Sequence, residues 1–343
     1  MKRLLPLKKF YVVILAIFFL LTLISFAEAS CGSANCSLIR GSQSGITNKG
    51  RFVFDISQRY VLMEDKHRGS SKTSDEVLTP KIDFENRTIL QKHHREVRTI
   101  NQLTQLDVSY GITEKLTASL NVPFRNDRRH EHFDDVDVAN GDFGTFNNVD
   151  GSTGMGDITL VLKYALLQTL KQQFILGAGI KFASGEFKLK DAEGAINEPT
   201  IMPGTGSYDP ILSGMYIYSV IPHRLSVFTA VTHRFATNNP LDYLFGDTTF
   251  VDGGMTYALS TIISLSAQIN ARIKRRDRYI GVPVDSTGGE FVNLTPGIIL
   301  AASQNLSIYT HVQIPIYQRV NEINLVPNYG LLFGASYGFN ALQ

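Results

Sequence analysis

The stretch Ile263-Ser-Leu-Ser-Ala-Gln-Ile-Asn-Ala-Arg-Ile-Lys274 alternates without a break between apolar and polar residues. Successive side chains along a β-strand point to opposite faces, so this stretch forms a strand with one apolar face and one polar face. Similar stretches recur from about residue 50 onwards, joined alternately by short turns and long polar loops. This pattern predicts a transmembrane β-barrel, in which the apolar faces meet lipid and the polar faces line the lumen.

The fold class expected over residues 51–343 is all-β, a single closed antiparallel transmembrane β-barrel of about twelve strands, although one hairpin more or fewer also fits. Connections after odd-numbered strands are long, and those after even-numbered strands are short, which places both chain ends on the short-turn, periplasmic side. A soluble β-sandwich is the alternative, but it has no reason to sort its loops in this way. The strands are expected near residues 51–62, before 110, 116–124, 155–167, 174–182, 208–220, 224–236, 248–260, 263–274, 290–303, 306–316 and 331–339.

Residues 1–29 have the features of a signal peptide. A basic start is followed by an apolar stretch at 11–27 and by a small-residue site, which predicts cleavage between Ala29 and Ser30. The alternative is an uncleaved anchor, since about 17 apolar residues are the lower limit for a membrane-spanning helix. Export combined with amphipathic strands indicates a protein of the bacterial outer membrane.

Residues 30–50 precede the first expected strand and are interpreted as a periplasmic or plug segment. They contain the two cysteines of the chain, Cys31 and Cys36. In an oxidising periplasm, this pair favours a small disulfide loop. Two thiols are too few to hold a structural zinc ion, so no metal is expected here.

Charged residues on the expected strands form a further group of candidates. An Arg or Lys that faces lipid at the bilayer midplane costs about 2–4 kcal/mol, so strand charges are expected to face the lumen. Two interpretations stay open: these charges stabilise the wall, or they line a conduit for polar solutes. Both signs occur, so no strong ion selectivity is predicted. The lumen-facing candidates are Asp107, Lys115, Asp157, Lys163, Lys181, Asp209, Asp252, Arg272 and Lys274.

Histidines and acidic residues gather in two of the expected loops. The first loop contains His93-His94, and the second, at about 125–154, contains Arg128-Arg-His-Glu-His132 and Asp134-Asp-Val-Asp137. The second group fails the calcium-loop pattern, because Ala139 occupies a ligand position. Both groups are expected to be solvated and to face lipopolysaccharide, and neither a metal ion nor a cofactor is expected.

Catalytic motifs are absent from the sequence. It has no G-x-x-x-x-G-K-[ST] phosphate loop, and its G-x-S-x-G match, Gly334-Ala-Ser-Tyr-Gly338, lies within an expected strand and not on the strand-to-helix turn of a nucleophile elbow. His223-Arg-Leu-Ser226 lacks the spacing of an outer-membrane phospholipase. The sequence therefore predicts a protein that is not an enzyme.

The charge balance excludes nucleic acid as an expected partner. The formal net charge of +2 becomes about −1 once the four basic residues and one acidic residue of the leader are removed. A nucleic-acid-binding face needs clustered basic residues. The expected partners are outer-membrane lipid, lipopolysaccharide, a small-molecule solute and the barrel-assembly machinery, which reads a terminal alternation like the one that ends at Phe339.

Three short motifs resemble those of a known family, the outer-membrane transporters of the "MetA-pathway of phenol degradation" group. They are Cys31-Gly-Ser-Ala-Asn-Cys-Ser-Leu38, Gly154-Met-Gly-Asp-Ile-Thr-Leu-Val-Leu-Lys-Tyr164 and Pro203-Gly-Thr-Gly-Ser-Tyr-Asp-Pro210. The chain departs from the family pattern at Ser37, where Pro is common, and at Tyr208, where Trp is common. The resemblance implies a barrel related to channels for hydrophobic compounds and transfers no catalytic residues.

The predicted function is therefore an outer-membrane channel for passive passage of small molecules, including hydrophobic or aromatic compounds. Two alternatives remain. The first is an outer-membrane enzyme of the lipase type. The second is a sealed barrel with a structural or adhesive role, expected if residues 31–50 or the long loops fill the lumen.

Overall fold

The computed structural model describes residues 45–137, 140–191 and 193–341. The expected signal peptide, its cleavage site and the Cys31–Cys36 pair lie outside the described residues. Among the described residues, no helix is long and apolar enough to cross a membrane.

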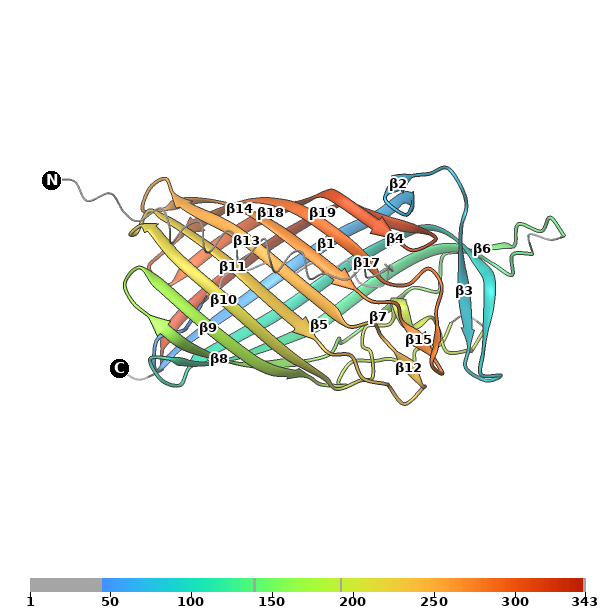
Figure 1. Ribbon diagram of the computed structural model, residues 1–343, viewed down its shortest axis with the longest axis horizontal. Helices are drawn as coiled ribbons and strands as arrows, with labels where there is room; N and C mark the ends of the chain where they lie inside the picture. Colours follow the sequence, from blue (N-terminus) through green and yellow to red (C-terminus); the bar gives the residue numbers. More distant parts are fainter. Residues whose placement is uncertain (1–44, 138–139, 192, 342–343) are drawn as a thin grey trace, which may run out of the picture.

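Twelve long antiparallel strands form one closed barrel, as the sequence predicts (Figure 1). The first strand, β1, pairs with the last, β19, on one side and with β4 on the other, and this pairing closes the ring. The strands around the barrel are β1 (Arg51–Arg68), β4 (Thr88–Gly111), β5 (Leu116–Asp134), β8 (Thr159–Gln168), β9 (Gln172–Lys181), β10 (Asp209–Ile221), β11 (Leu225–Arg234), β13 (Thr248–Ala258), β14 (Ile263–Lys274), β17 (Gly289–Ala301), β18 (Leu306–Val320) and β19 (Ile323–Asn340).

The shorter elements gather at the end of the barrel that carries the long connections, here called the long-loop end (Figure 1). The other end, with the short turns, is the short-turn end. The shorter elements are β2 (Ser71–Lys72), β3 (Val77–Asp83), β6 (Thr145–Asn147), β7 (Ser152–Gly154), β12 (Tyr243–Leu244), β15 (Arg278–Tyr279), β16 (Val282–Pro283) and the 3-10 helix η2 (Pro199–Ile201).

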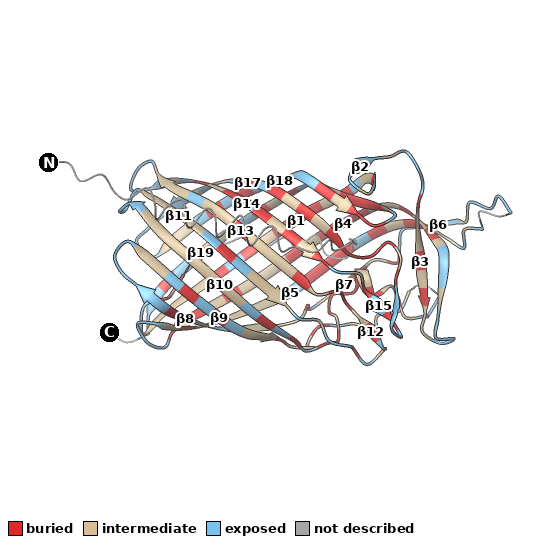
Figure 2. Ribbon diagram, in the orientation of Figure 1, coloured by how far each residue is buried: buried red, intermediate tan, exposed pale blue. Residues whose placement is uncertain are grey.

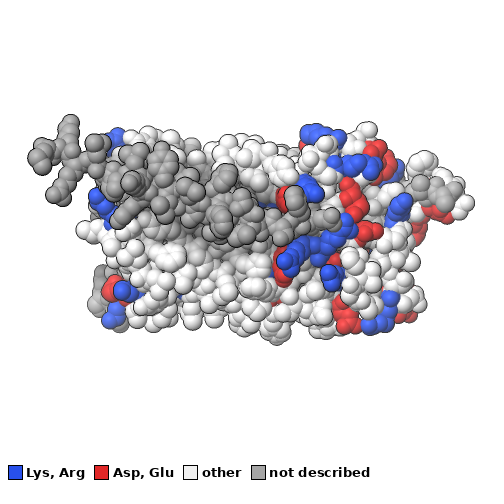
Figure 3. Space-filling model, in the orientation of Figure 1, with Lys and Arg blue, Asp and Glu red and all other residues white. Residues whose placement is uncertain are grey.

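The wall of the barrel has an apolar outside and a polar inside. On β14, Ile269 is 43% exposed, whereas the next residue, Asn270, is fully buried. Figure 3 shows charged side chains gathered at the two ends, mostly at the long-loop end, with a nearly uncharged band between them. This distribution matches a barrel whose outer band contacts lipid.

At two inward-facing glycines, large neighbours occupy the space that the missing side chain would leave. A Cβ on Gly334 would lie 2.3 Å from the ring of Tyr309, and one on Gly297 would lie 2.1 Å from the ring of His311. Figure 2 shows buried residues concentrated in the half of the barrel nearest the long loops. The lumen is therefore more densely packed than its glycines and serines suggest.

Four strands, β1, β4, β5 and β19, extend well beyond the ranges that the sequence predicts, and one connection is shorter. Strands β1, β4 and β5 continue through much of the two long loops expected after residues 62 and 124. A tilted strand needs only about 9–11 residues to cross a bilayer, so the outer parts of these strands project beyond it. The connection from β18 to β19 is a tight turn at residues 321–322 instead of a long loop.

Candidate functional site

The connection between β9 and β10 folds into the long-loop end of the barrel. Its residues 182–191 and 193–208 are here called the lumen loop. Inward-facing side chains of β5 hold its backbone: Asn126 Nδ2 donates to Pro203 O at 2.9 Å, and Arg128 Nη1 donates to Thr200 O at 2.7 Å. Ile201 and Met202 of this loop are buried. The lumen loop therefore narrows the barrel from within.

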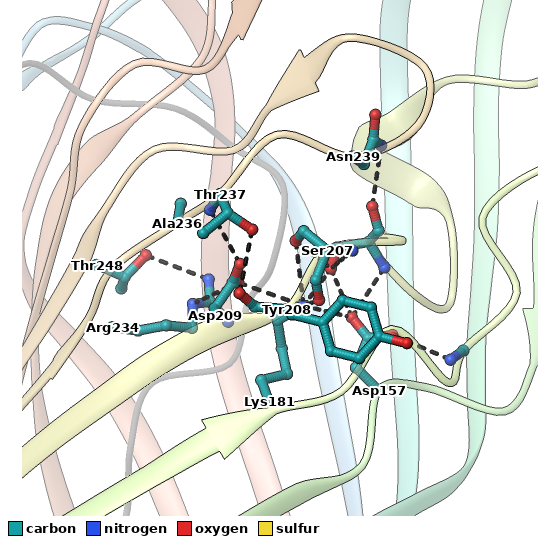
Figure 4. A network of polar contacts seen from close by, with 12 residues as sticks. Asp157, Lys181, Ser207, Tyr208, Asp209, Arg234, Ala236, Thr237, Asn239 and Thr248 are labelled. Carbon is teal, nitrogen blue, oxygen red and sulfur yellow. Dashed lines mark hydrogen bonds and ion pairs between the residues drawn. The ribbon is translucent and has the colours of Figure 1, made fainter.

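A buried lysine ties the base of the lumen loop to the wall (Figure 4). Lys181, at the end of β9, lies 2.7 Å from Asp157 Oδ2 and 3.2 Å from Asp209 Oδ2, both distances measured from Nζ. The same ammonium donates to Ser207 O at 2.8 Å and to Thr205 Oγ1. These side chains come together because Asp209 pairs directly with Lys181 between neighbouring strands.

The two carboxylates of this network also bind backbone groups of the loops. Asp157 accepts hydrogen bonds from Gly185 N at 3.0 Å and from Thr205 N at 2.9 Å. Asp209 accepts one from Thr237 N at 3.1 Å (Figure 4). The Gly154–Tyr164 and Pro203–Pro210 motifs, which are separate in sequence, therefore meet at one polar junction.

Glycines allow the close approach of chains at this junction. A Cβ on Gly204 would lie 2.5 Å from the backbone of Gly185, too close for any side chain. Gly206 has a φ of +72°, in the left-handed region that favours glycine, and a Cβ there would meet the ring of Phe187. The lumen loop depends on both glycines for its inward fold.

Two cavities lie inside the barrel, next to the lumen loop and further along the wall. The first, of about 260 Å³, is lined by Asp157, Lys181 and Lys274 and by loop residues 199–200 and 202–205. The second, of about 200 Å³, is lined by residues of β5, β8, β9, β10 and β11. Both are lined by Thr159, so they adjoin.

Several of the predicted lumen-facing residues are buried among polar partners. Asp107 accepts a hydrogen bond from Asn121 Nδ2 at 2.7 Å, and Asp252 accepts one from Asn270 Nδ2 at 2.7 Å. Lys163 lines the second cavity. The structure thus places these charges on the inner side of the wall.

Two further predicted residues lie nearer the long-loop end, and one lies elsewhere. The guanidinium of Arg272 stacks over the ring of Phe291 at 4.5 Å, and Lys274 Nζ lies 2.6 Å from Asp277 Oδ1. The prediction for Lys115 is wrong: this residue is exposed in the turn between β4 and β5. The alternating pattern extends one residue too far there, because the turn precedes Leu116.

The histidine groups are not solvated, contrary to the sequence-based expectation. His94 lies on β4 and His130 and His132 lie on β5, and their residues are only 2–3% exposed. His132 Nε2 lies 2.8 Å from Asp134 Oδ1, and His130 Nε2 lies 3.1 Å from Glu96 Oε2. The expectation fails because the strands continue past the bilayer and turn these side chains inward.

This histidine cluster is coupled to the lumen loop through Glu198, which directly precedes η2. His94 Nδ1 is hydrogen-bonded to Glu198 Oε1. Burial lowers the pKa of His94, but the negative charge of Glu198 and the neighbouring acids outweigh it and raise the pKa to about 10. Burial raises the pKa of Glu198, but the charge of His94 prevails and lowers it to about 2. Sequence reasoning did not single out Glu198, because no nearby motif marks it.

The closed wall, the uncharged outer band and the polar interior together define an outer-membrane β-barrel. The sequence profile of the family described as "Putative MetA-pathway of phenol degradation" matches residues 100–320. The chain belongs to this family, as its motifs predict. No curated protein matches the chain in sequence.

Solved structures agree with the barrel fold. The COG4313 outer membrane channel from Pseudomonas putida F1 superposes with a TM-score of 0.61 at 11% identity, covering 88% of this chain and 100% of that chain. The P. putida toluene transporter TodX superposes with a TM-score of 0.46 at 14% identity, covering 92% of this chain and 99% of that chain. The NanC porin superposes with a TM-score of 0.43 at 12% identity, covering 83% of this chain and 98% of that chain. The fold assignment rests on the first of these, which is an outer membrane channel.

Proposed function

We propose that the protein is a passive channel for neutral molecules of about the size of a single aromatic ring. The observation that carries this proposal is the pair of adjoining lumen cavities, of about 260 and 200 Å³. A cavity of about 150 Å³ already accommodates benzene. The second cavity combines apolar Val161, Ile175 and Met215 with polar Lys163 and Thr232, which suits a ring that carries one polar group.

Two findings support a channel of this kind. The solved barrel with the higher fold similarity is an outer membrane channel. The family description refers to phenol degradation, and phenol is a single ring with one hydroxyl. The long-loop end faces the exterior and lipopolysaccharide in this proposal, and the uncharged band faces lipid.

The buried charges serve in this proposal to hold the wall and the lumen loop. Lys181 and Arg234 balance the charges of the two carboxylates, Asp157 and Asp209, so the group presents little net charge to a passing solute. Lys274 is paired with Asp277 in the same way. A neutral solute therefore meets no unbalanced charge at this level of the lumen.

The segment at 30–50 acts in this proposal as a partial plug of the periplasmic mouth. Thr47 N donates to Thr117 Oγ1 of β5 at 2.9 Å. A Cβ on Gly45 would lie 3.3 Å from Gln173 of β9 and 3.4 Å from Ile217 of β10. Just before β1, the chain thus lies against the part of the wall that runs from β5 to β10.

Uptake of phenol into vesicles that contain the refolded protein tests the proposal. Ala230, which is buried and lines the second cavity, is changed to Phe to fill that cavity. We expect the Ala230→Phe variant to reduce phenol uptake several-fold, because the added ring occupies the solute path. Ala271→Phe is the matched control, since Ala271 lies in phase with the outward-facing Ile269.

Three outcomes would contradict the proposed channel. The first is folded wild-type protein that takes up no phenol and shows no discrete conductance in a planar bilayer. This result would favour a sealed barrel. The second is equal uptake by the wild type and Ala230→Phe, which would place the solute path elsewhere in the barrel. The third is equal loss in Ala271→Phe, which would show that the ring acts through folding.

A further inference from the structure

Four buried side chains converge at the long-loop end, outside the cavities of the proposed channel. They are His94 of β4, His132 and Asp134 of β5, and Asp150, which lies between β6 and β7. His94 Nε2 and His132 Nε2 lie 3.0 and 2.8 Å from the same atom, Asp134 Oδ1. His132 Nε2 also lies 3.7 Å from Asp150 Oδ2.

The spacing of these atoms is that of ligands around one metal ion. Tetrahedral zinc with bonds of about 2.0–2.1 Å places neighbouring ligand atoms about 3.3 Å apart. The three distances of 2.8, 3.0 and 3.7 Å bracket this value. The ligand atoms of His132, Asp134 and Asp150 all lie within 4.8 Å of one another, and those of His93, His94 and Asp134 do so as well, so the two groups share Asp134.

A second layer of polar groups orients three of these four side chains, those of His94, Asp134 and Asp150. His94 Nδ1 is bonded to the Glu198 carboxylate, as the outer nitrogen of a metal-bound histidine commonly is. Asn147 Nδ2 donates to Asp134 Oδ2 at 2.8 Å and to Asp150 Oδ2 at 2.5 Å. Ligands held by outer partners are preorganised for a cation.

We propose that His94, His132, Asp134 and Asp150 bind one divalent transition-metal ion of the zinc class. Two imidazoles with two carboxylates suit zinc, whereas magnesium and calcium prefer sites made of oxygen alone. The ion joins the outer parts of β4 and β5 to the segment before β7. Glu198 places the lumen loop in contact with this centre. The sequence signal is the spacing of His130, His132 and Asp134, which puts all three on one face of a strand.

Metal analysis after equilibrium dialysis of the refolded mature chain against Zn²⁺ tests this proposal. We expect one ion per chain in the wild type and loss of that ion in His132→Gln and Asp150→Asn. His223→Gln is the matched control, because His223 is exposed in the β10–β11 turn. Heat-dependent mobility of the barrel on detergent gels establishes that each variant is folded.

Cobalt reports the coordination directly. Co²⁺ in a tetrahedral site of nitrogen and oxygen ligands absorbs visible light, and we expect this absorption in the wild type and in a Cys31→Ser, Cys36→Ser variant. Glu198→Gln should weaken binding by about 10–100-fold without abolishing it, as loss of an outer partner does. Complete loss would make Glu198 a ligand and would overturn the proposed ligand set.

Two results would reject the site outright. One is folded wild-type protein that holds no Zn²⁺ after dialysis. The other is Zn²⁺ binding that is unchanged in His132→Gln or is lost equally in His223→Gln, since either would make the bound metal adventitious. Both results concern binding alone, so they do not depend on whether the barrel conducts.

Discussion

Replacing Lys181 with Met removes the positive charge from the centre of the polar junction while keeping a side chain of similar length. The Lys181 and Asp157 side chains are 5% and 6% exposed, and that of Asp209 is fully buried. The substitution therefore leaves Asp157 without its lysine partner and Asp209 with Arg234 alone, at 3.7 Å, in a site that is almost fully buried. Removal of one partner from a buried ion pair destabilises a protein by about 3–5 kcal/mol. We expect the free energy of unfolding of Lys181→Met to fall by this amount.

Urea unfolding in lipid vesicles, followed by far-ultraviolet circular dichroism, measures the change. With a urea dependence of about 3 kcal/mol/M, a loss of 3–5 kcal/mol lowers the midpoint by about 1–2 M. Lys171→Met is the matched control, because Lys171 is exposed in the β8–β9 turn, and it should change stability by less than about 0.5 kcal/mol. Adding Asp157→Asn to Lys181→Met should recover part of the loss, because it removes the carboxylate that has lost its lysine partner.

The same variant should alter conductance. Lys181 donates to Ser207 O and Thr205 Oγ1, so its loss frees the base of the lumen loop. We expect larger and noisier conductance steps in planar bilayers than for the wild type or Lys171→Met. The lysine does not hold the loop if two results are found together. The free energy of unfolding of Lys181→Met would lie within about 0.5 kcal/mol of that of the wild type, and its conductance would be identical.

Three further substitutions test the wall and the loop. Ile269→Arg places a charge on the lipid-facing side and should lower the free energy of folding into vesicles by about 2–4 kcal/mol, whereas Leu170→Arg, at a position 99% exposed, should change it little. Gly206→Ala should destabilise the protein in urea unfolding by about 1 kcal/mol or more, because φ is +72° there; an unchanged midpoint would contradict this. Tyr309→Phe removes the hydrogen bond from Tyr309 Oη to Asp55 Oδ1 at 2.6 Å and should lower the free energy of unfolding by about 1.5–3 kcal/mol in the same assay. An unchanged free energy of unfolding would contradict a stabilising role for that bond.

The barrel could be predicted from the sequence because lipid imposes a simple rule on its wall. Every second residue of a membrane-crossing strand must be apolar, and β14 follows this rule along its whole length. The rule also found most of the strands between β8 and β18 to within a few residues. Lys115 was misplaced because it continues the alternation of β5 into a turn, where the rule no longer applies.

The outer parts of β4 and β5 could not be found in this way. Beyond the bilayer, the outer face of a strand meets water, so polar residues occur on both faces and the apolar alternation ends. The stretch Arg125–Asp134 is charged on both faces and therefore resembles a loop. The residues that face the lumen still indicate a strand, because His130, His132 and Asp134 occupy every second position. Chemically related side chains at this spacing indicate a strand even where hydrophobicity does not.

The direction of the lumen loop follows from the burial of charge. The sheet register places Asp209 and Thr159 on either side of Lys181, so the order of strands alone brings the lysine next to Asp209 and close to Asp157. Buried carboxylates need more hydrogen bonds than one lysine supplies. The backbone amides of Gly185 and Thr205 provide them only when the loop folds inward. A loop that left the barrel would leave Asp157 without these two hydrogen bonds, so the charges on the wall favour a loop that folds inward and narrows the lumen.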